Sequence, residues 1–279
     1  MSRHKRISRK PGFNISIPFL WIALLLSLVP FYVMIIGSLK PNMALFVIPL
    51  DLNPFRLILT NYKYVFTKMD ITNWYANSLF ISIMIALLSV VVAATGGYAF
   101  AKKNFIGKRI LFAILLATMM LPRQILMVPN FLVANSLGLH NRLIGVVLTS
   151  INAAFGVFLC KQFMSTLPNE LSEAAEIDGC SEIGIFLKII APLSRPVLGA
   201  LGIFSFITGW NDFVWQNIML TSKSLRTMPI AIAFLSQEKI SYIGYQMAGA
   251  TLSAVPMIII FLYFQKYFIK GITVGGVKG

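Results

Sequence analysis

Six apolar stretches, each close to the length that crosses a lipid bilayer, recur along this 279-residue chain. About 20 consecutive apolar residues in a helix span the hydrocarbon core of a membrane. The predicted spans are residues 17–37, 77–101, 110–129, 142–163, 196–217 and 249–268. Pro122 and Pro256 lie inside two of them and are expected to bend those helices. Because 57% of the residues are hydrophobic and 12% charged, with a mean hydropathy of +0.79, the sequence predicts an all-α membrane protein of six transmembrane helices.

The formal charge of +15 is distributed unevenly along the chain. With the N-terminus inside, the cytoplasmic segments are residues 1–16, 102–109, 164–195 and 269–279. Short basic clusters then lie at the N-terminus, after the second span and at the C-terminus, as the positive-inside rule requires. Longer loops at 38–76 and 218–248 lie outside. This distribution explains the basicity without a nucleic acid, for which no binding motif is present. We expect a multi-pass protein of the cytoplasmic (inner) membrane, with both termini cytoplasmic.

Neither metal chemistry nor nucleotide binding is indicated. Cys160 and Cys180 do not make a disulfide framework, and His4 and His140 are isolated from any acidic partner. The tail Gly271–Gly279 has glycines at P-loop spacing, but valine stands where the motif requires lysine, and no helix follows. We therefore expect no cofactor and no metal in this chain, so any ATP that it uses must be bound by another chain.

The negative charge is concentrated in residues 168–192, which we call the acidic loop. Five of the nine acidic residues lie there, namely Glu170, Glu173, Glu176, Asp178 and Glu182. Pro168 suits the first turn of a helix that Gly179 can end in a left-handed conformation. Ser181 can cap a second short helix that stops at Pro192. Its apolar stripe at helical spacing consists of Ile183, Phe186, Leu187 and Ile190.

Two interpretations of the acidic loop are open. It is either an amphipathic connector that rests on the membrane surface or a segment that docks into a groove of a protein partner. The first helix presents a narrow face formed by Leu171, Ala174, Ala175 and Asp178. Interfacial helices usually carry Lys and Arg, which attract anionic lipids. The negative charge of this loop therefore favours the protein partner.

The order of residues in the loop carries a family resemblance. Glu173-Ala174-Ala175 is followed after three residues by Gly179, and after nine more by Ile189 and Pro192. This pattern resembles the EAA loop of bacterial ABC importer permeases, and departs from it only at Ala191, where Leu is usual. Further motifs resemble the carbohydrate-uptake branch: Asn61-Tyr62 with Asn77-Ser78, Gly138-Leu139, Trp210-Asn211-Asp212-Phe213, Arg226-Thr227 and the terminal Gly-Val-Lys-Gly. From about Lys40 onward, the chain resembles the second permease subunits of maltose importers.

The resemblance implies a type I ABC importer permease fold with six transmembrane helices. Residues 73–270 would form the transmembrane domain, which contains the acidic loop as a cytoplasmic coupling helix. Residues 1–72 would hold the basic N-terminus, the first helix and an outer loop, and 271–279 a cytoplasmic tail. The implied partners are a second permease subunit in a heterodimer, two copies of a cytoplasmic ATPase subunit, an extracytoplasmic sugar-binding protein and membrane lipid. This chain would form half of the path for a sugar, oligosaccharide or polyol-phosphate, while the ATPase subunits hydrolyse ATP.

Two sets of residues are expected to carry this function. The resemblance assigns ATPase coupling to Glu173, Ala174, Ala175, Asp178, Gly179, Phe186, Ile189 and Pro192. Inward-facing polar and aromatic side chains indicate a substrate path that includes Asn77, Asn152, Trp210, Asn211 and Asp212. Trp210 has two interpretations, because its ring can stack on a sugar or anchor the helix at the membrane interface.

Two other classes of function are compared with the permease, a secondary transporter and a membrane-embedded enzyme. A secondary transporter for a small polar solute usually needs an ionisable group at mid-membrane, but no predicted span has an acidic residue near its centre. A membrane-embedded enzyme needs a convergent acid, base, nucleophile or metal set. Only scattered Ser, Thr and Asn are present in the spans, so the sequence favours the permease.

Overall fold

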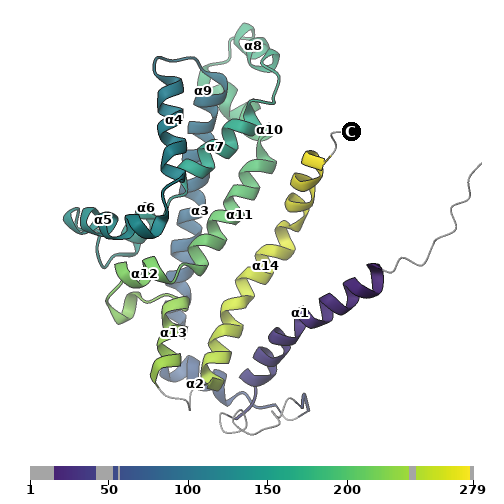
Figure 1. The fold of residues 1–279 in the computed structure, drawn as a ribbon, viewed down its shortest axis with the longest axis vertical. Helices are drawn as coiled ribbons and strands as arrows, with labels where there is room; N and C mark the ends of the chain where they lie inside the picture. Colours follow the sequence, from purple (N-terminus) through teal and green to yellow (C-terminus); the bar gives the residue numbers. More distant parts are fainter. Residues whose placement is uncertain (1–15, 42–52, 56, 239–242, 277–279) are drawn as a thin grey trace, which may run out of the picture.

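The protein is a helical bundle whose long axis is set by three apolar helices. The structure, a computed structural model, describes residues 16–41, 53–55, 57–238 and 243–276, and every regular element in these ranges is a helix or a helical turn. The helices long and apolar enough to cross a membrane are α1 (Ser16–Ser38), α3 (Ile71–Lys102) and α14 (Ile243–Gly276). Figure 1 shows α3 within the bundle, whereas α1 diverges from it and contacts α14. The predicted all-α membrane class is confirmed.

The remaining candidate spans are bent rather than straight. The bent pairs are α4 (Lys108–Met119) with α5 (Arg123–Ser136) at 105°, α6 (Leu143–Thr149) with α7 (Ala153–Met164) at 46°, and Glu182–Leu193 with α11 (Arg195–Asn211) at 77°. The described part of the chain therefore holds three spans, or up to six if each bent pair counts as one. In Figure 1, α5 and α6 extend sideways from the bundle instead of continuing along it.

Several predicted spans differ from the observed helices, including 142–163, which is divided between α6 and α7. The span at 110–129 is not one helix, because α4 ends at Met119 and α5 begins at Arg123. Pro122 lacks an N–H and disfavours helical geometry in the preceding residue, so the predicted bend there becomes a full break. The span at 196–217 is interrupted where Asp212 adopts an extended conformation before α12 (Val214–Met219). Helix α14 continues past Pro256 and past its predicted end at 268, as far as Gly276.

The two segments predicted to lie outside the membrane contain helices of their own. These are α2 (Thr60–Lys68), a short 3-10 turn (Lys223–Leu225) and α13 (Met228–Glu238). They lie around the start of α3, at the end of the molecule opposite α8 (Figure 1). Their apolar residues bury Trp74, Trp210 and Met228 in one cluster. We call this part of the structure the outer cap.

Small residues bring α3 and α7 into close contact. A Cβ atom on Gly97 would overlap the side chain of Cys160 and lie 3.0 Å from the backbone nitrogen of Lys161. On the facing helix, a Cβ on Gly156 would lie 2.7 Å from the Cβ of Ala93. Between helices in lipid, association depends on such close van der Waals packing. Because α7 leads directly into the acidic loop, this contact also fixes where the loop begins.

Replacing Gly97 with Ala should lower the thermal unfolding temperature of the purified protein. The added methyl group meets backbone as well as side chain, and overpacking of this kind costs about 1–3 kcal/mol. Gly249→Ala is the matched control, since its Cβ would lie 3.5 Å from Ile232 Cγ1, an ordinary contact. Alanine also favours helix over glycine. Equal unfolding temperatures for Gly97→Ala and the parent protein would contradict this packing.

Candidate coupling loop and substrate path

The first half of the acidic loop is a short helix that ends at a glycine turn. Helix α8 (Glu170–Ile177) begins two residues after Pro168, which therefore lies before the helix and not in its first turn as predicted. Gly179 adopts a left-handed conformation with φ of +77°. The Cys180 N–H donates to the Ala175 carbonyl at 2.9 Å. This bond closes a turn of six residues, as in a Schellman motif. The predicted glycine turn is confirmed.

The second half is longer than predicted. The hydroxyl of Ser181 accepts a hydrogen bond from the Gly184 N–H at 3.3 Å, so the predicted cap of α9 (Glu182–Ile185) is confirmed. The helix then continues through a π-helical turn (Phe186–Ile190) and α10 (Ala191–Leu193). Pro192 therefore does not end it. In the wider π turn, the Ala191 N–H donates to the Phe186 carbonyl, five residues earlier. Pro192 has no N–H, so it adds no hydrogen bond of its own.

The buried face of the second helix includes only two of the four predicted stripe residues, Phe186 and Ile190. Ile185 and Ile190 are buried against α3, α7 and α11, and Phe186 and Ile189 pack beside them. Two members of the predicted stripe, Ile183 and Leu187, are instead exposed. All of these positions are apolar, so helical spacing alone did not decide which face the bundle covers.

The two alanines of the loop likewise face different ways. Ala175 is buried in the same cluster as Ile185, whereas Ala174 is exposed. The loop therefore leaves a set of exposed apolar residues, which are Leu171, Ala174, Ile177, Ile183 and Leu187. The side chain of Ile177 reaches 87% exposure. Exposed apolar residues gathered in one short segment are typical of a protein–protein contact.

Tyr98 and Lys103, at and just after the end of α3, hold the second helix through one carboxylate. The Tyr98 hydroxyl donates to Glu182 Oε1 at 2.5 Å, and Lys103 Nζ lies 2.5 Å from Glu182 Oε2. Lys103 also lies 3.8 Å from Glu176 Oε1 in α8. The hydrogen bonds from Lys103 and then Tyr98 lower the pKa of Glu182, so this carboxylate stays ionised. We call these contacts the Glu182 tie.

A second contact fixes the start of α8. Lys102 Nζ donates to the carbonyl oxygen of Leu167 at 2.5 Å and to Asn169 Oδ1 at 2.8 Å. Both short helices of the acidic loop are thus bonded to the last turn of α3 or the residue after it. The loop and α3 form one packed unit.

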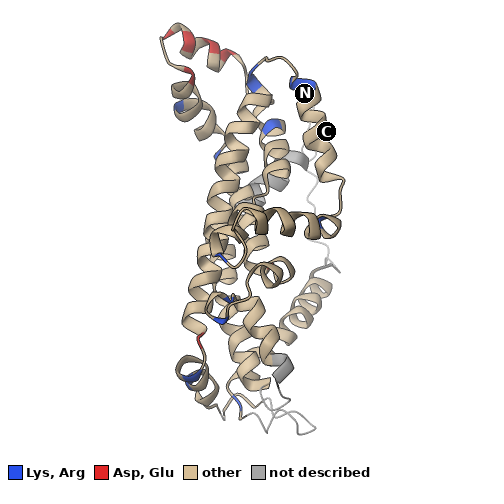
Figure 2. Cartoon of the chain, turned by 90° about the vertical axis from the view of Figure 1, so that its left-hand side faces the viewer, with Lys and Arg blue, Asp and Glu red and all other residues tan. Residues whose placement is uncertain are grey.

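The other carboxylates of the loop face outward. Glu170, Glu173 and Asp178 are exposed and form no ion pair within the described part of the chain. In Figure 2, the ribbon of acidic residues, drawn red, is concentrated at the end of the molecule that carries the acidic loop. Two carboxylates of the loop therefore neutralise Lys103, and three remain for contacts outside this chain.

The residues expected in the substrate path do not form a single site. Asn77 lies in the outer cap, where its Nδ2 donates to the carbonyl oxygens of Ser224 and Arg226 at 2.9 and 3.0 Å. These bonds fix the segment after α12 onto α3. Its contribution in this structure is to position the outer cap.

Asn152 lies at the break between α6 and α7. Its backbone N–H donates to the Ser89 hydroxyl at 3.0 Å, and its Nδ2 donates to the Ser205 hydroxyl at 3.3 Å. Ser89 and Ser205 are fully buried on α3 and α11. This group joins the three central helices with polar contacts.

Trp210 is enclosed by other side chains. Its ring is 1% exposed, lies edge-on to Tyr75 with centroids 5.6 Å apart, and is stacked with Phe206. Its indole N–H donates to the Ser253 carbonyl at 3.2 Å. In this structure the ring joins α11 to α14, so stacking on a sugar would require a conformational change that exposes it.

Asn211 and Asp212 lie where α11 ends. Asn211 is exposed, whereas the Asp212 side chain is only 10% exposed. Arg123 Nη2 lies 2.7 Å from Asp212 Oδ2, and the Trp215 N–H donates to Oδ1 at 3.1 Å. Arg123 thus has a carboxylate partner. The ion pair joins the start of α5 to the break before α12.

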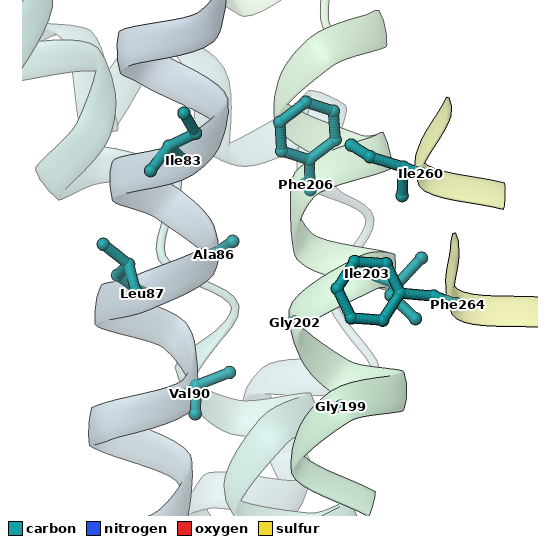
Figure 3. A pocket seen from close by; sticks show the side chains of 10 residues that line it. All are labelled: Ile83, Ala86, Leu87, Val90, Gly199, Gly202, Ile203, Phe206, Ile260 and Phe264. Atoms are coloured by element: carbon teal, nitrogen blue, oxygen red, sulfur yellow. The ribbon is translucent and has the colours of Figure 1, made fainter. Parts of the chain in front are cut away.

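An apolar groove of about 290 Å³ lies between α3, α11 and α14 (Figure 3). It is lined by Ile83, Ala86, Leu87, Val90, Gly199, Gly202, Ile203, Phe206, Ile260 and Phe264. None of these side chains can form a hydrogen bond, whereas each hydroxyl of a sugar requires a polar partner when it leaves water. The groove is therefore unsuited to a sugar.

Sequence reasoning missed the partners that hold the predicted residues. Tyr98 and Lys103 are far in the chain from Glu182, and the only signal was a tyrosine and a lysine pair at the end of an apolar span. Ser89 gave a similar signal as a polar residue inside α3. Within the described ranges, no group of three or more His, Cys, Asp or Glu residues could hold a metal.

Comparison with known proteins places the chain among transport components. A model of the family described as the binding-protein-dependent transport system inner membrane component matches residues 85–274, which include the whole acidic loop. The arabinooligosaccharides transport system permease protein of Halalkalibacterium halodurans is 39% identical over 268 residues, covering 95% of this chain and 96% of that protein. The melibiose/raffinose/stachyose import permease protein of Bacillus subtilis is 30% identical over 259 residues, covering 90% and 91%.

A solved structure has the same fold. The chain is similar, with a TM-score of 0.84 and 22% identity, to a chain of a bacterial ABC transporter involved in the import of the acidic polysaccharide alginate. The likeness covers 93% of this chain and 100% of that one. The overall fold is therefore one already seen in a bacterial ABC transporter.

The Glu182 tie should weaken as the pH falls. The pKa of Glu182 is lowered in the folded protein, so the tie contributes stability above the ordinary pKa of a glutamate and loses it as the pH falls through the lowered value. Amide hydrogen exchange in Glu182–Leu193, corrected for its intrinsic rate, should rise in that window. Lys103→Met should raise exchange already at neutral pH.

Arg109→Met is the matched control, because it removes an exposed cation near the start of α4 without touching the tie. Its exchange profile should follow that of the parent protein. If Lys103→Met and Arg109→Met behave alike, the tie does not hold the helix.

Proposed function

Because the chain belongs to the binding-protein-dependent transport system inner membrane component family, we propose that it is a permease subunit of an ATP-driven ABC importer for a sugar or oligosaccharide. It forms half of the translocation path across the cytoplasmic membrane. The names of its relatives support this substrate class, since they are arabinooligosaccharide and melibiose, raffinose and stachyose permeases. They favour the importer over a secondary transporter.

The exposed surface of the acidic loop carries this proposal. Ile177 and Ile183 are 87% and 70% exposed in a segment outside the predicted spans, and the negative charge of this segment disfavours contact with anionic lipids. With Glu173 and Asp178 nearby in the chain, they suit an apolar groove with a basic rim on a soluble protein. A cytoplasmic ATPase subunit is the partner that an importer requires at this position. In this proposal the ATPase subunit binds the ATP, and this chain binds no cofactor.

The predicted coupling residues divide into two roles. Glu173, Ala174 and Asp178 contact the ATPase from the exposed side of the loop, and Gly179 sets the angle between its helices. The loop is supported from within by Ala175, Phe186 and Ile189, which pack in the cluster around Ile185 and Ile190, while Pro192 lies in α10. Their packing keeps the exposed side in a fixed orientation.

Movement of the loop reaches the path through α3. The Glu182 tie and the bonds of Lys102 join the loop to the end of α3, which packs along α7 and α11. Closure of two ATPase subunits would draw the loops of two permease subunits together. The bundle would then turn from inward-facing to outward-facing, a hinge-type transition.

The complete importer contains four kinds of protein. This chain pairs with a second permease subunit, two copies of a cytoplasmic ATPase subunit bind at the acidic loops, and an extracytoplasmic binding protein delivers the sugar. Both termini and the acidic loop are cytoplasmic, and the outer cap faces the binding protein. Residues 73–270 form the transmembrane domain of this subunit.

Gly179→Val should abolish most sugar uptake while the subunit remains in the membrane. A β-branched residue at φ of +77° costs about 1 kcal/mol or more, because its Cβ clashes with the local backbone. The strain changes the angle between α8 and α9. Uptake of labelled sugar and subunit abundance should be measured in the same membranes. Normal uptake would remove the loop from the coupling pathway.

Ala174→Trp should have the same effect through a different cause. The larger side chain projects from the exposed side and obstructs the ATPase contact without altering the core. Ala175→Trp would instead disturb folding, since Ala175 is 5% exposed. The control is Ile106→Trp, an equally bulky change at a fully exposed position of the preceding cytoplasmic segment. The two variants should differ in ATPase retention during purification, and equal retention would contradict the proposed contact.

Cys180 should react with a membrane-impermeant thiol reagent only from the cytoplasmic side. It is half-buried at the turn of the acidic loop, whereas Cys160 is fully buried and should not compete. Labelling in inside-out vesicles should decrease when the ATPase subunits are bound. Labelling of intact spheroplasts would reverse the proposed orientation.

A further inference from the structure

A polar hollow of about 350 Å³ lies in the outer cap, between α2, the start of α3, the Lys223–Leu225 turn and α13. Its volume lies within the range of roughly 300–1,000 Å³ that small-ligand sites occupy. The chemically active part of its wall consists of Lys68, Asp70, Trp74, Lys223, Arg226 and Phe234. Unlike the groove of Figure 3, it offers charged groups and hydrogen-bond donors.

The charges around the hollow are not balanced. Lys68, Lys223 and Arg226 form no ion pair with a carboxylate anywhere in the described part of the chain. The one carboxylate in the wall, Asp70, accepts a hydrogen bond at 2.8 Å from Asn73 Nδ2. Three cations therefore face a single anion, and an added negative charge would be attracted.

A second, independent observation concerns Trp74. Its side chain lines the hollow and the residue is only 5% exposed, yet its indole N–H has no hydrogen-bond acceptor in the structure. Buried polar groups without partners are rare in proteins, because the group loses its water and gains nothing. An acceptor oxygen that enters the hollow could satisfy this donor after a small adjustment of the wall.

Arg226 is held in place before any ligand arrives. The guanidinium of Arg226 lies 3.9 Å from the centroid of the Phe234 ring, while its backbone carbonyl accepts from Asn77. The Met228 N–H donates to the Ser78 hydroxyl at 2.8 Å, which fixes the start of α13 on α3. Donors that are already positioned lose less entropy when a ligand binds.

We propose that this hollow is a carboxylate-binding site that faces the outside of the membrane. The outward orientation rests on the proposed function. A planar guanidinium and two ammonium groups suit a carboxylate. A doubly charged phosphate is less suitable, because the Asp70 carboxylate lies in the same wall. The carboxylate comes either from an acidic sugar or from an acidic side chain of the extracytoplasmic binding protein, and both present the same chemistry.

The test uses the complete importer in lipid nanodiscs and two arms. One arm measures binding of galacturonate, with galactose as its neutral counterpart, and the other measures binding of the soluble binding protein at increasing salt concentration. Arg226→Met and Lys223→Ala should each weaken binding of the ligand that occupies the hollow, galacturonate or the binding protein, about tenfold. This is the loss expected for one charge-assisted contact. Trp74→Phe keeps the ring and removes the N–H, and it should weaken the same binding.

Lys63→Ala is the matched control, because Lys63 is an exposed cation of α2 that does not line the hollow. An Arg226-dependent response to galacturonate but not galactose would identify an acidic sugar. Arg226-dependent, salt-sensitive binding of the soluble protein would identify a side chain. If Arg226→Met, Lys223→Ala and Lys63→Ala are alike in both arms, there is no carboxylate site. A complete lack of sugar uptake by the unmutated importer would instead count against the proposed function.

Discussion

Every backbone N–H and C=O group in the hydrocarbon core has to be paired within the protein, and the rest of this structure depends on that constraint. Unbroken helices meet it by themselves. Where a helix breaks, side chains complete the pairing: Ser89 accepts from the Asn152 N–H, and Asp212 accepts from the Trp215 N–H. Polar residues inside the spans are therefore needed to pair backbone groups of the protein, and such a residue is not free to bind a solute. Asn152 and Asp212, which resemble path residues in the sequence, already have such bonds.

Features set by neighbouring residues were predictable from the sequence. Gly179 ends α8 because only a residue without a side chain adopts its φ of +77° at little cost, and Ser181 caps the next helix within three residues. Hydropathy likewise predicted the apolar helices α1, α3 and α14. The break at Pro122 was visible as a bend, but its angle of 105° depends on how α5 packs and not on the proline alone.

Features set by distant residues were not predictable. The second helix of the acidic loop is apolar on two sides, and the side that is buried was selected by α3, α7 and α11. Pro192 appeared to end that helix because sequence patterns do not reveal a π turn. The role of Glu182 was also hidden, since its partners Tyr98 and Lys103 come from another span. For the substrate path, residue types indicated which side chains are polar, but not which of them were already bonded.

The surroundings of an exposed apolar side chain differ between the predicted membrane spans and the acidic loop. On α1, exposed residues such as Leu25 and Leu26 need no explanation beyond lipid, because the bilayer is their solvent. Ile177 and Ile183 belong to a segment bonded to Lys102 and Lys103 at the charged end of α3 and lie outside the predicted spans. There water is the alternative to a protein partner, and exposure to water is unfavourable. The loop thus combines a rigid attachment to its own bundle with a surface that remains unfavourable until another protein covers it.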